Sequence, residues 1–169
     1  GRQAELKGLQ QRLGITFVFV THDQGEALSM ADRVAVFSRG RVEQLDTPRG
    51  LYTRPRTAFV ASFVGSANVV TGALAERLTG RCAPFAIRPE LIEVHAPDAA
   101  LTAGMLGTDG TLEDVLYHGS SSRCHVRTDD GTVLAVARAE SAGAEPLPPR
   151  GARVRLAWLA SDTVALEAE

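Results

Sequence analysis

The stretch from Ile15 to Ala31 constrains the fold more than any other part of the chain. It opens with an almost unbroken run of β-branched and aromatic residues from Ile15 to Val20, which is typical of a strand buried on both faces, as in the parallel sheets of α/β domains. Polar residues follow at once, and Asp23 precedes Glu26 by the three positions of a helix capping box. We therefore expect a buried strand, a turn, and a helix that begins near Gln24.

His22 stands where this expected strand ends. Ligands of open α/β sheets bind at the carboxyl ends of the strands, so a histidine here occupies the place of a reactive or phosphate-sensing group. Its position alone also fits a simpler role in closing the turn before the helix. For Asp23 and Glu26 we favour the structural role, helix capping.

The segment before the strand has the pattern of a helix that Gly14 closes in the left-handed conformation. A helix followed at once by a buried strand is a crossover unit of a parallel sheet, and the other strands of such a sheet are not in this sequence. We therefore expect the chain to be the C-terminal part of a longer protein, divided within an α/β domain.

Two short strands, Val34–Phe37 and Arg41–Leu45, are predicted to form a hairpin, since Gly40 between them tolerates the positive φ of a tight turn. Short helices should follow from Thr47 onward, the last of them ending at Gly65.

Beyond Ser66 the apolar pattern changes from helical to alternating, as in antiparallel strands. We expect the second and third of these strands to pair around Arg88 and Glu90, and residues 98–110 to form a mobile connection. Many short strands in about a hundred residues favour a small OB-like barrel. The predicted strands are 69–74, 84–87, 91–95, 111–117, 122–128, 132–137, 153–158 and 163–166.

Charge differs between the two parts of the chain. Up to Gly65 there are nine Lys and Arg against six Asp and Glu, and after it nine against fourteen, which argues against a nucleic-acid-binding surface on the second part. No apolar run approaches the roughly 18 residues of a membrane span. Cys82 and Cys124 are expected to be reduced, buried small hydrophobes. No metal site is expected from His95, His118, Cys124 and His125, because they lie on different predicted strands, except that Cys124 and His125 are neighbours whose side chains point to opposite faces.

An ordered series of motifs resembles the ATP-binding subunits of ABC importers. The series is LGITFVFVTHDQGEALSMADRVAVFSRGRVEQLDTPRGLYTRP, FVASFVG with Asn68 close behind, FAIRPELIEV, DGTVLAV and VRLAWLASDTVAL. The resemblance implies that residues 1–65 are the α/β end of a P-loop nucleotide-binding domain. It further implies that residues 66–169 are a TOBE domain, the OB-like all-β barrel of the subset importing polyamines, ferric iron, sugars and oxyanions.

The same resemblance implies roles for single residues. His22 matches the switch histidine, whose imidazole reaches the γ-phosphate of ATP, with Mg²⁺ bound elsewhere in the intact protein. Arg88 and Glu90 match an Arg-Pro-Glu element, for which we favour a structural ion pair over ligand binding. A basic strip with His125 on the predicted strands is open to two interpretations, an anion-binding surface or a solvated face, and we favour the second. Its other members are Arg123, Arg127, Arg153 and Arg155.

Several parts of such an ATPase are missing from this sequence. No G-x-x-x-x-G-K-[ST] loop is present, since Lys7 is the only lysine and lacks that context, and neither the signature sequence nor the carboxylates of the metal site are found. We therefore expect the chain alone to have no ATP turnover, and no cofactor to bind to it.

The resemblance implies a homodimer that works with transmembrane permease subunits and, through them, a solute-binding protein, on the cytoplasmic face of the plasma membrane. The competing interpretation is a stand-alone regulatory, dimerisation or ligand-sensing barrel. A third, an OB-type nucleic-acid binder, is weakened by the acidic second part and by the scarcity of aromatic residues for base stacking.

Overall fold

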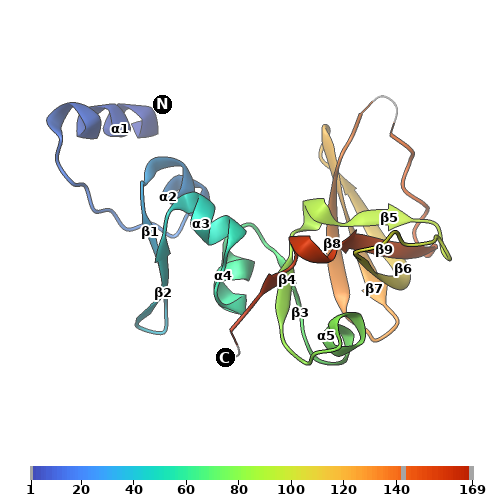
Figure 1. Ribbon diagram of the computed structural model, residues 1–169. Helices are drawn as coiled ribbons and strands as arrows, with labels where there is room; N and C mark the ends of the chain where they lie inside the picture. The colour runs from blue at the N-terminus through green and yellow to red at the C-terminus, as the bar shows by residue number, and fades with distance from the viewer. Residues whose placement is uncertain (1, 142–143, 168–169) are drawn as a thin grey trace. The chain divides into compact units, whose positions relative to one another are not determined.

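The computed structural model describes residues 2–141 and 144–167 (Figure 1). The chain forms two compact units, one that ends at Pro55 and one that begins at Arg56. The division precedes the boundary expected near Gly65, because the helix over Ala58–Phe63 packs on strands of the second unit. None of the described helices has the length and apolar character needed to cross a membrane.

The described residues of the first unit form three helices and a hairpin. The antiparallel pairing of the hairpin strands is as predicted, and Gly40 in its turn has a φ of +77°. Asp23 and Thr47 cap the second and third helices through their side chains, which confirms both helix starts. The elements are α1 (Arg2–Leu13), α2 (Gln24–Met30), β1 (Val34–Ser38), β2 (Arg41–Asp46) and α3 (Pro48–Thr53).

The predicted buried strand at Ile15 to Val20 is wrong. These residues have no regular secondary structure, and all are exposed, Val18 by 89% and Val20 by 96%. A strand needs neighbours to bond its N–H and C=O groups, and no other described segment of this chain pairs with this one. The described part of this chain therefore has no strands that could bury the apolar run.

The second unit is β-rich, with antiparallel strands in two sheets. The order in the smaller sheet is β10-β4-β3, and in the larger β5-β9-β6-β7-β8 (Figure 1). The described strands therefore have the predicted class, although they form two sheets where a single closed barrel was expected. The elements are α4 (Ala58–Phe63), β3 (Asn68–Val70), α5 (Gly72–Thr79), β4 (Phe85–Ile87), η1 (Pro89–Leu91), β5 (Glu93–His95), β6 (Met105–Tyr117), β7 (Ser121–Thr128), β8 (Val133–Ala139), β9 (Arg153–Leu159), η2 (Ala160–Asp162) and β10 (Val164–Ala165).

Strand β6 organises the larger sheet. Its first part pairs with β9 and its second part with β7, and Gly110 takes part in both ladders. A Cβ at Gly110 would lie 2.6 Å from the carbonyl oxygen of Arg127, so only glycine permits this close crossing. The core of this unit includes Leu112 and Leu156 and the fully buried Trp158.

Three expectations for the second unit are wrong. The segment 69–74 is not one strand, because β3 ends at Val70 and α5 begins at Gly72, where Ala, Leu, Glu and Arg favour a helix. β4 and β5 do not pair, since η1 turns the chain between them and β5 joins β9 in the other sheet. The supposed connection 98–110 contains the start of β6 at Met105.

The two cysteines differ in exposure. Cys124 is 1% exposed in the core, where burial, with a smaller contribution from Asp114, raises the pKa of its thiol to about 11. Cys82 is exposed in the loop after α5, so the expectation that both are buried is wrong for Cys82.

This difference predicts the thiol chemistry of the folded chain. Since the thiolate is the reactive form, a thiol reagent at pH 8 is expected to modify one cysteine in the folded chain and two after unfolding. Cys82→Ser should abolish the fast reaction and leave the reaction after unfolding. Rapid labelling of Cys124 in the folded variant would contradict the burial described here.

Candidate functional site

The Thr21-His22-Asp23 turn joins the exposed apolar run to α2. Asp23 is the N-cap of α2, with its Oδ1 accepting from the N–H of Glu26 at 3.0 Å. This confirms the predicted capping interaction. His22 is exposed, and its imidazole has no hydrogen-bond partner among the residues that the structure describes.

The second hydrogen bond of the expected capping box, from the N–H of Asp23 to the side chain of Glu26, is not formed directly. In a standard box the Glu side chain reaches the N–H of the N-cap residue. Here the Thr21 hydroxyl lies between the two groups: it accepts from the N–H of Asp23 at 3.0 Å and donates to Glu26 Oε2 at 2.9 Å. The other carboxylate oxygen of Glu26 accepts from Gln3 Nε2 on α1 at 3.4 Å. His22 therefore lies between two residues whose positions α2 determines.

Arg88 has a structural position in the second unit. Its side chain is 7% exposed, and its Nη1 donates to the carbonyl oxygens of Ala61, at 3.3 Å, and of Val64. These carbonyls belong to the end of α4, where a helix leaves its last acceptors unpaired. Glu90 is exposed in the first turn of η1. Arg88 thus fastens α4 onto the β-rich unit, and the proposed ion pair with Glu90 stays a prediction.

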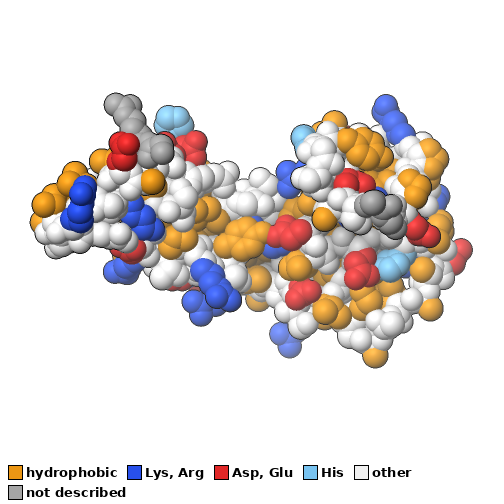
Figure 2. All heavy atoms as spheres, turned by 90° about the horizontal axis from the view of Figure 1, so that it is seen from above, with side chains coloured by type: hydrophobic (Ala, Val, Ile, Leu, Met, Phe, Trp, Pro, Cys, Tyr) orange, Lys and Arg blue, Asp and Glu red, His pale blue; other side chains and the backbone are white. Residues whose placement is uncertain are grey.

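Most of the predicted basic strip is neutralised by acidic neighbours. Arg155 binds Asp109 in a bidentate pair at 2.6 and 2.8 Å, and Arg153 binds Asp129 at 2.6 and 3.1 Å. Arg127 likewise binds both carboxylate oxygens of Glu113, and His125 makes a single contact with Asp114 through Nδ1. The interpretation of a solvated face of paired charges is therefore favoured over that of an anion-binding strip, and Figure 2 shows acidic and basic side chains interspersed over the surface it presents.

The Asp109–Arg155 pair makes the stability of the second unit sensitive to acid. The hydrogen bond from Arg155 is the main cause that holds the pKa of Asp109 below its ordinary value, against the raising effect of burial. A lowered pKa in the folded state adds stability above the unfolded-state pKa, about 3.9, and that stability is lost as the pH falls through the lowered value.

We therefore expect Asp109→Asn to lower the free energy of unfolding at pH 7 by at most about 1 kcal/mol, because the pair is partly exposed. The difference from the wild type should shrink as the pH falls below about 4. Urea titrations at several pH values measure this. The control is Glu76→Gln, at an exposed carboxylate that pairs with no other residue in the described part of the chain. A difference that grows toward acid pH would contradict the assignment.

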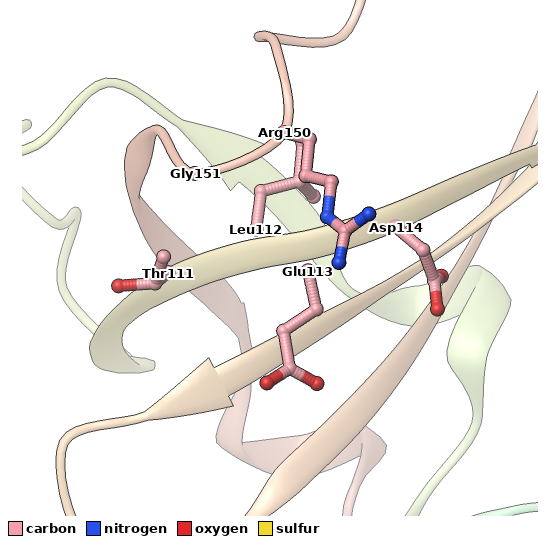
Figure 3. Close-up of a pocket in the computed structure, with 6 residues that line it drawn as sticks. All are labelled: Thr111, Leu112, Glu113, Asp114, Arg150 and Gly151. Carbon is pink, nitrogen blue, oxygen red and sulfur yellow. The ribbon is translucent and has the colours of Figure 1, made fainter.

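One shallow hollow of about 510 Å³ lies beside the second half of β6 (Figure 3). Its acidic groups already have partners, because Glu113 accepts from Arg127 and Asp114 binds His125. Arg150 extends over it from the loop before β9 (Figure 3). These groups do not converge on a common point, so the hollow lacks the arrangement of a catalytic site. Its lining residues are Thr111, Leu112, Glu113, Asp114, Arg150 and Gly151.

Histidines and acidic residues do not gather into a metal site within the described residues. His95 pairs with Glu93 at 2.8 Å, and His125 with Asp114 at 2.7 Å, on separate strands. Each of these pairs supplies two donors, fewer than the three or four that a zinc site uses.

Asn68 is a structurally important residue to which no role was assigned from the sequence. It is 8% exposed, and its side-chain amide pairs with the backbone of Ala135: Nδ2 donates to the carbonyl at 2.8 Å, and Oδ1 accepts from the N–H at 2.7 Å. Asn68 begins β3 and Ala135 lies on β8, so this pair joins an end strand of one sheet to an end strand of the other.

Comparisons with known proteins agree with the motifs. Residues 85–166 match the TOBE domain family. The chain is 52% identical over 159 residues to an uncharacterized ABC transporter ATP-binding protein, YdcT, of Escherichia coli K12, covering 92% of this chain and 45% of that protein. It is 38% identical over 181 residues to the spermidine/putrescine import ATP-binding protein PotA of Thermobifida fusca, covering 92% of this chain and 46% of that protein.

Among solved structures, the cytoplasmic molybdate-binding protein ModG aligns with a TM-score of 0.44 and 14% identity, over 54% of this chain and 67% of ModG. So low a TM-score does not establish a shared fold. The sequence relatives are far more informative, although the chain spans less than half the length of those it matches. The resemblance is thereby confirmed: the homologues of this chain are ABC transporter ATP-binding proteins, and its residues 85–166 match the TOBE domain family.

Proposed function

We propose that this chain is the C-terminal portion of the ATP-hydrolysing subunit of an ABC solute importer. The single observation that carries the proposal is the identity with ABC ATP-binding proteins over 92% of the chain, which includes the Thr-His-Asp turn. In this proposal residues 1–65 are the end of the nucleotide-binding domain and residues 66–169 the TOBE domain.

His22 is the residue of this chain that we place in the catalytic assembly. The imidazole is exposed and has no hydrogen-bond partner among the described residues, so it is free to donate a hydrogen bond to the γ-phosphate of ATP. A donor aimed at charge that develops during phosphoryl transfer stabilises the transition state. ATP and Mg²⁺ are bound chiefly by parts of the intact protein outside this chain. The exposed apolar run from Ile15 to Val20 supports the same proposal, because further strands of such a domain would cover it.

The partners follow from the same proposal. The intact protein works at the cytoplasmic face of the membrane with permease subunits and a solute-binding protein. We propose polyamines as the first solutes to test, because several relatives at 35–38% identity are spermidine/putrescine import proteins. The name of the relative at 52% identity gives no solute.

The TOBE domain is proposed to join two ATPase subunits and to regulate them. Leu116 and Tyr117, at the end of β6, are 50% and 67% exposed, and exposed apolar side chains support a contact with a second copy. The chain is therefore expected to sediment as a dimer. A clean monomer at micromolar concentration would count against this role.

The whole proposal is tested with the intact protein and its permease in membrane vesicles. We expect uptake of labelled putrescine that depends on ATP and on a binding protein. The alternative, a stand-alone ligand-sensing module, predicts that the chain alone binds a solute; a calorimetric titration with micromolar affinity would favour it. Absence of ATP hydrolysis in the intact protein would refute the ATPase assignment.

A further inference from the structure

The turn that carries His22 is held from both sides by one hydroxyl group. Thr21 Oγ1 accepts from the N–H of Asp23 and donates to the carboxylate of Glu26, at 3.0 and 2.9 Å. Only a hydroxyl side chain can accept and donate at the same time from this position. The residues before and after His22 are thus tied to each other and to α2.

Glu26 extends this connection in two directions. Its N–H is bound by the side chain of Asp23, and its carboxylate by Thr21 and, more weakly, by Gln3 of α1. Glu26 is half-buried, while His22 is exposed. Hydrogen bonds therefore hold the backbone of the turn more firmly than they hold the side chain of His22.

His22 depends on this anchoring, because its imidazole has no hydrogen-bond partner within the described part of the chain. Its direction is set by the backbone of the turn and by its own two side-chain torsions. Since small misplacement of a reacting group lowers a rate sharply, the groups that fix this backbone should matter for catalysis.

We propose that Thr21 and Glu26 are positioning residues for His22. The hydroxyl of Thr21 and the carboxylate of Glu26 hold the turn in one conformation, so that the imidazole of His22 is presented to the γ-phosphate with little freedom. This inference rests on the proposed ATPase function and names two residues through which His22 acts. Neither of them touches the nucleotide in this proposal.

The test uses the intact protein with Thr21→Val, which keeps the shape and removes the hydroxyl, and Thr21→Ser, which restores it. We expect Thr21→Val and Glu26→Ala, which remove the donor and the acceptor of this hydrogen bond, to lower kcat for ATP about tenfold or more, with KM little changed. Thr21→Ser should stay within about twofold of the wild type. Thr53→Val is the matched control, since it removes a hydroxyl that donates to the carbonyl of Arg49 on α3.

A second measurement separates positioning from general stability. Amide exchange at Asp23 should become faster in Thr21→Val while the midpoint of urea unfolding changes no more than in Thr53→Val. Unchanged kcat in both Thr21→Val and Glu26→Ala would overturn the inference. A loss of kcat in Thr21→Val that Thr21→Ser also shows would overturn it as well. His22→Ala tests the proposed catalytic role of His22 separately from the positioning role of Thr21 and Glu26. If His22→Ala leaves turnover intact, the role of His22 fails, whatever Thr21→Val does.

Discussion

Replacement of His22 by alanine in the intact protein is expected to lower ATP turnover by about 10² to 10³-fold, the usual effect of removing one donor aimed at developing negative charge. Binding of ATP should change far less, because the proposed function assigns most phosphate contacts to a G-x-x-x-x-G-K-[ST] loop, which this sequence does not contain. Folding should be unaffected, since the side chain is exposed and has no hydrogen-bond partner within the described residues.

The measurement compares single-turnover ATP hydrolysis with nucleotide binding in the same preparation. His118→Ala is the matched control, because His118 is likewise exposed, in the turn between β6 and β7, and should keep wild-type turnover. An His22→Ala protein that hydrolyses ATP within threefold of the wild type would remove His22 from the catalytic assembly and leave the turn a helix cap only.

Local features of the fold were predictable from the sequence, because their causes lie within a few residues. The hairpin formed where Gly40 allowed its turn, and α2 began where Asp23 could cap it. The run from Ile15 to Val20 was not predictable in this way. Its apolar residues favour burial between neighbouring strands, but a strand forms only where neighbouring strands hydrogen-bond to it.

The second unit gives a different lesson. Alternation in the segment after Ser66 suggested a strand at 69–74, but the residues after Gly72 form α5 instead. These residues favour a helix, and as a helix they also bury Leu74 and Ala75 in the core, so the local preference and the packing agree. The arrangement of the strands in two sheets depends on contacts between residues far apart in sequence, such as Gly110 with Arg127. No local pattern encodes those contacts.

The candidate site was predictable in part. His22 and its cap were found from position and spacing, whereas the hydroxyl bridge from Thr21 to Glu26 was not, because a Thr before a turn is common and its partner depends on side-chain geometry. Likewise, a basic strip can be recognised in a sequence, but its neutralisation by Asp109 and Asp129 becomes visible only when strands lie side by side.

Asn68→Ala is expected to produce the largest loss of stability among the polar substitutions considered, about 2 to 4 kcal/mol of the free energy of unfolding. The substitution removes two hydrogen bonds to Ala135 and leaves a backbone N–H and a carbonyl without their partners, at about 1 to 3 kcal/mol for each group that stays buried. Urea titration followed by the fluorescence of Trp158, the only tryptophan, reports on the unit concerned.

Asn68→Asp tests the geometry of this pair more strictly, because it keeps the shape and the acceptor for the N–H of Ala135 while it replaces the donor by an oxygen that faces a carbonyl. An ionised carboxylate is repelled there, so its folded-state pKa should rise above the unfolded value of about 3.9. Stability should therefore approach that of the wild type at low pH, where the protonated group donates again, and fall as the pH rises.

Gln10→Ala, which removes an exposed amide that donates to the carbonyl of Ile15, should change stability by no more than about 0.5 kcal/mol at any pH. If Asn68→Asp were as stable as the wild type at pH 7, the two sheets would not depend on this amide, and the contact between β3 and β8 would have to rest on apolar packing alone.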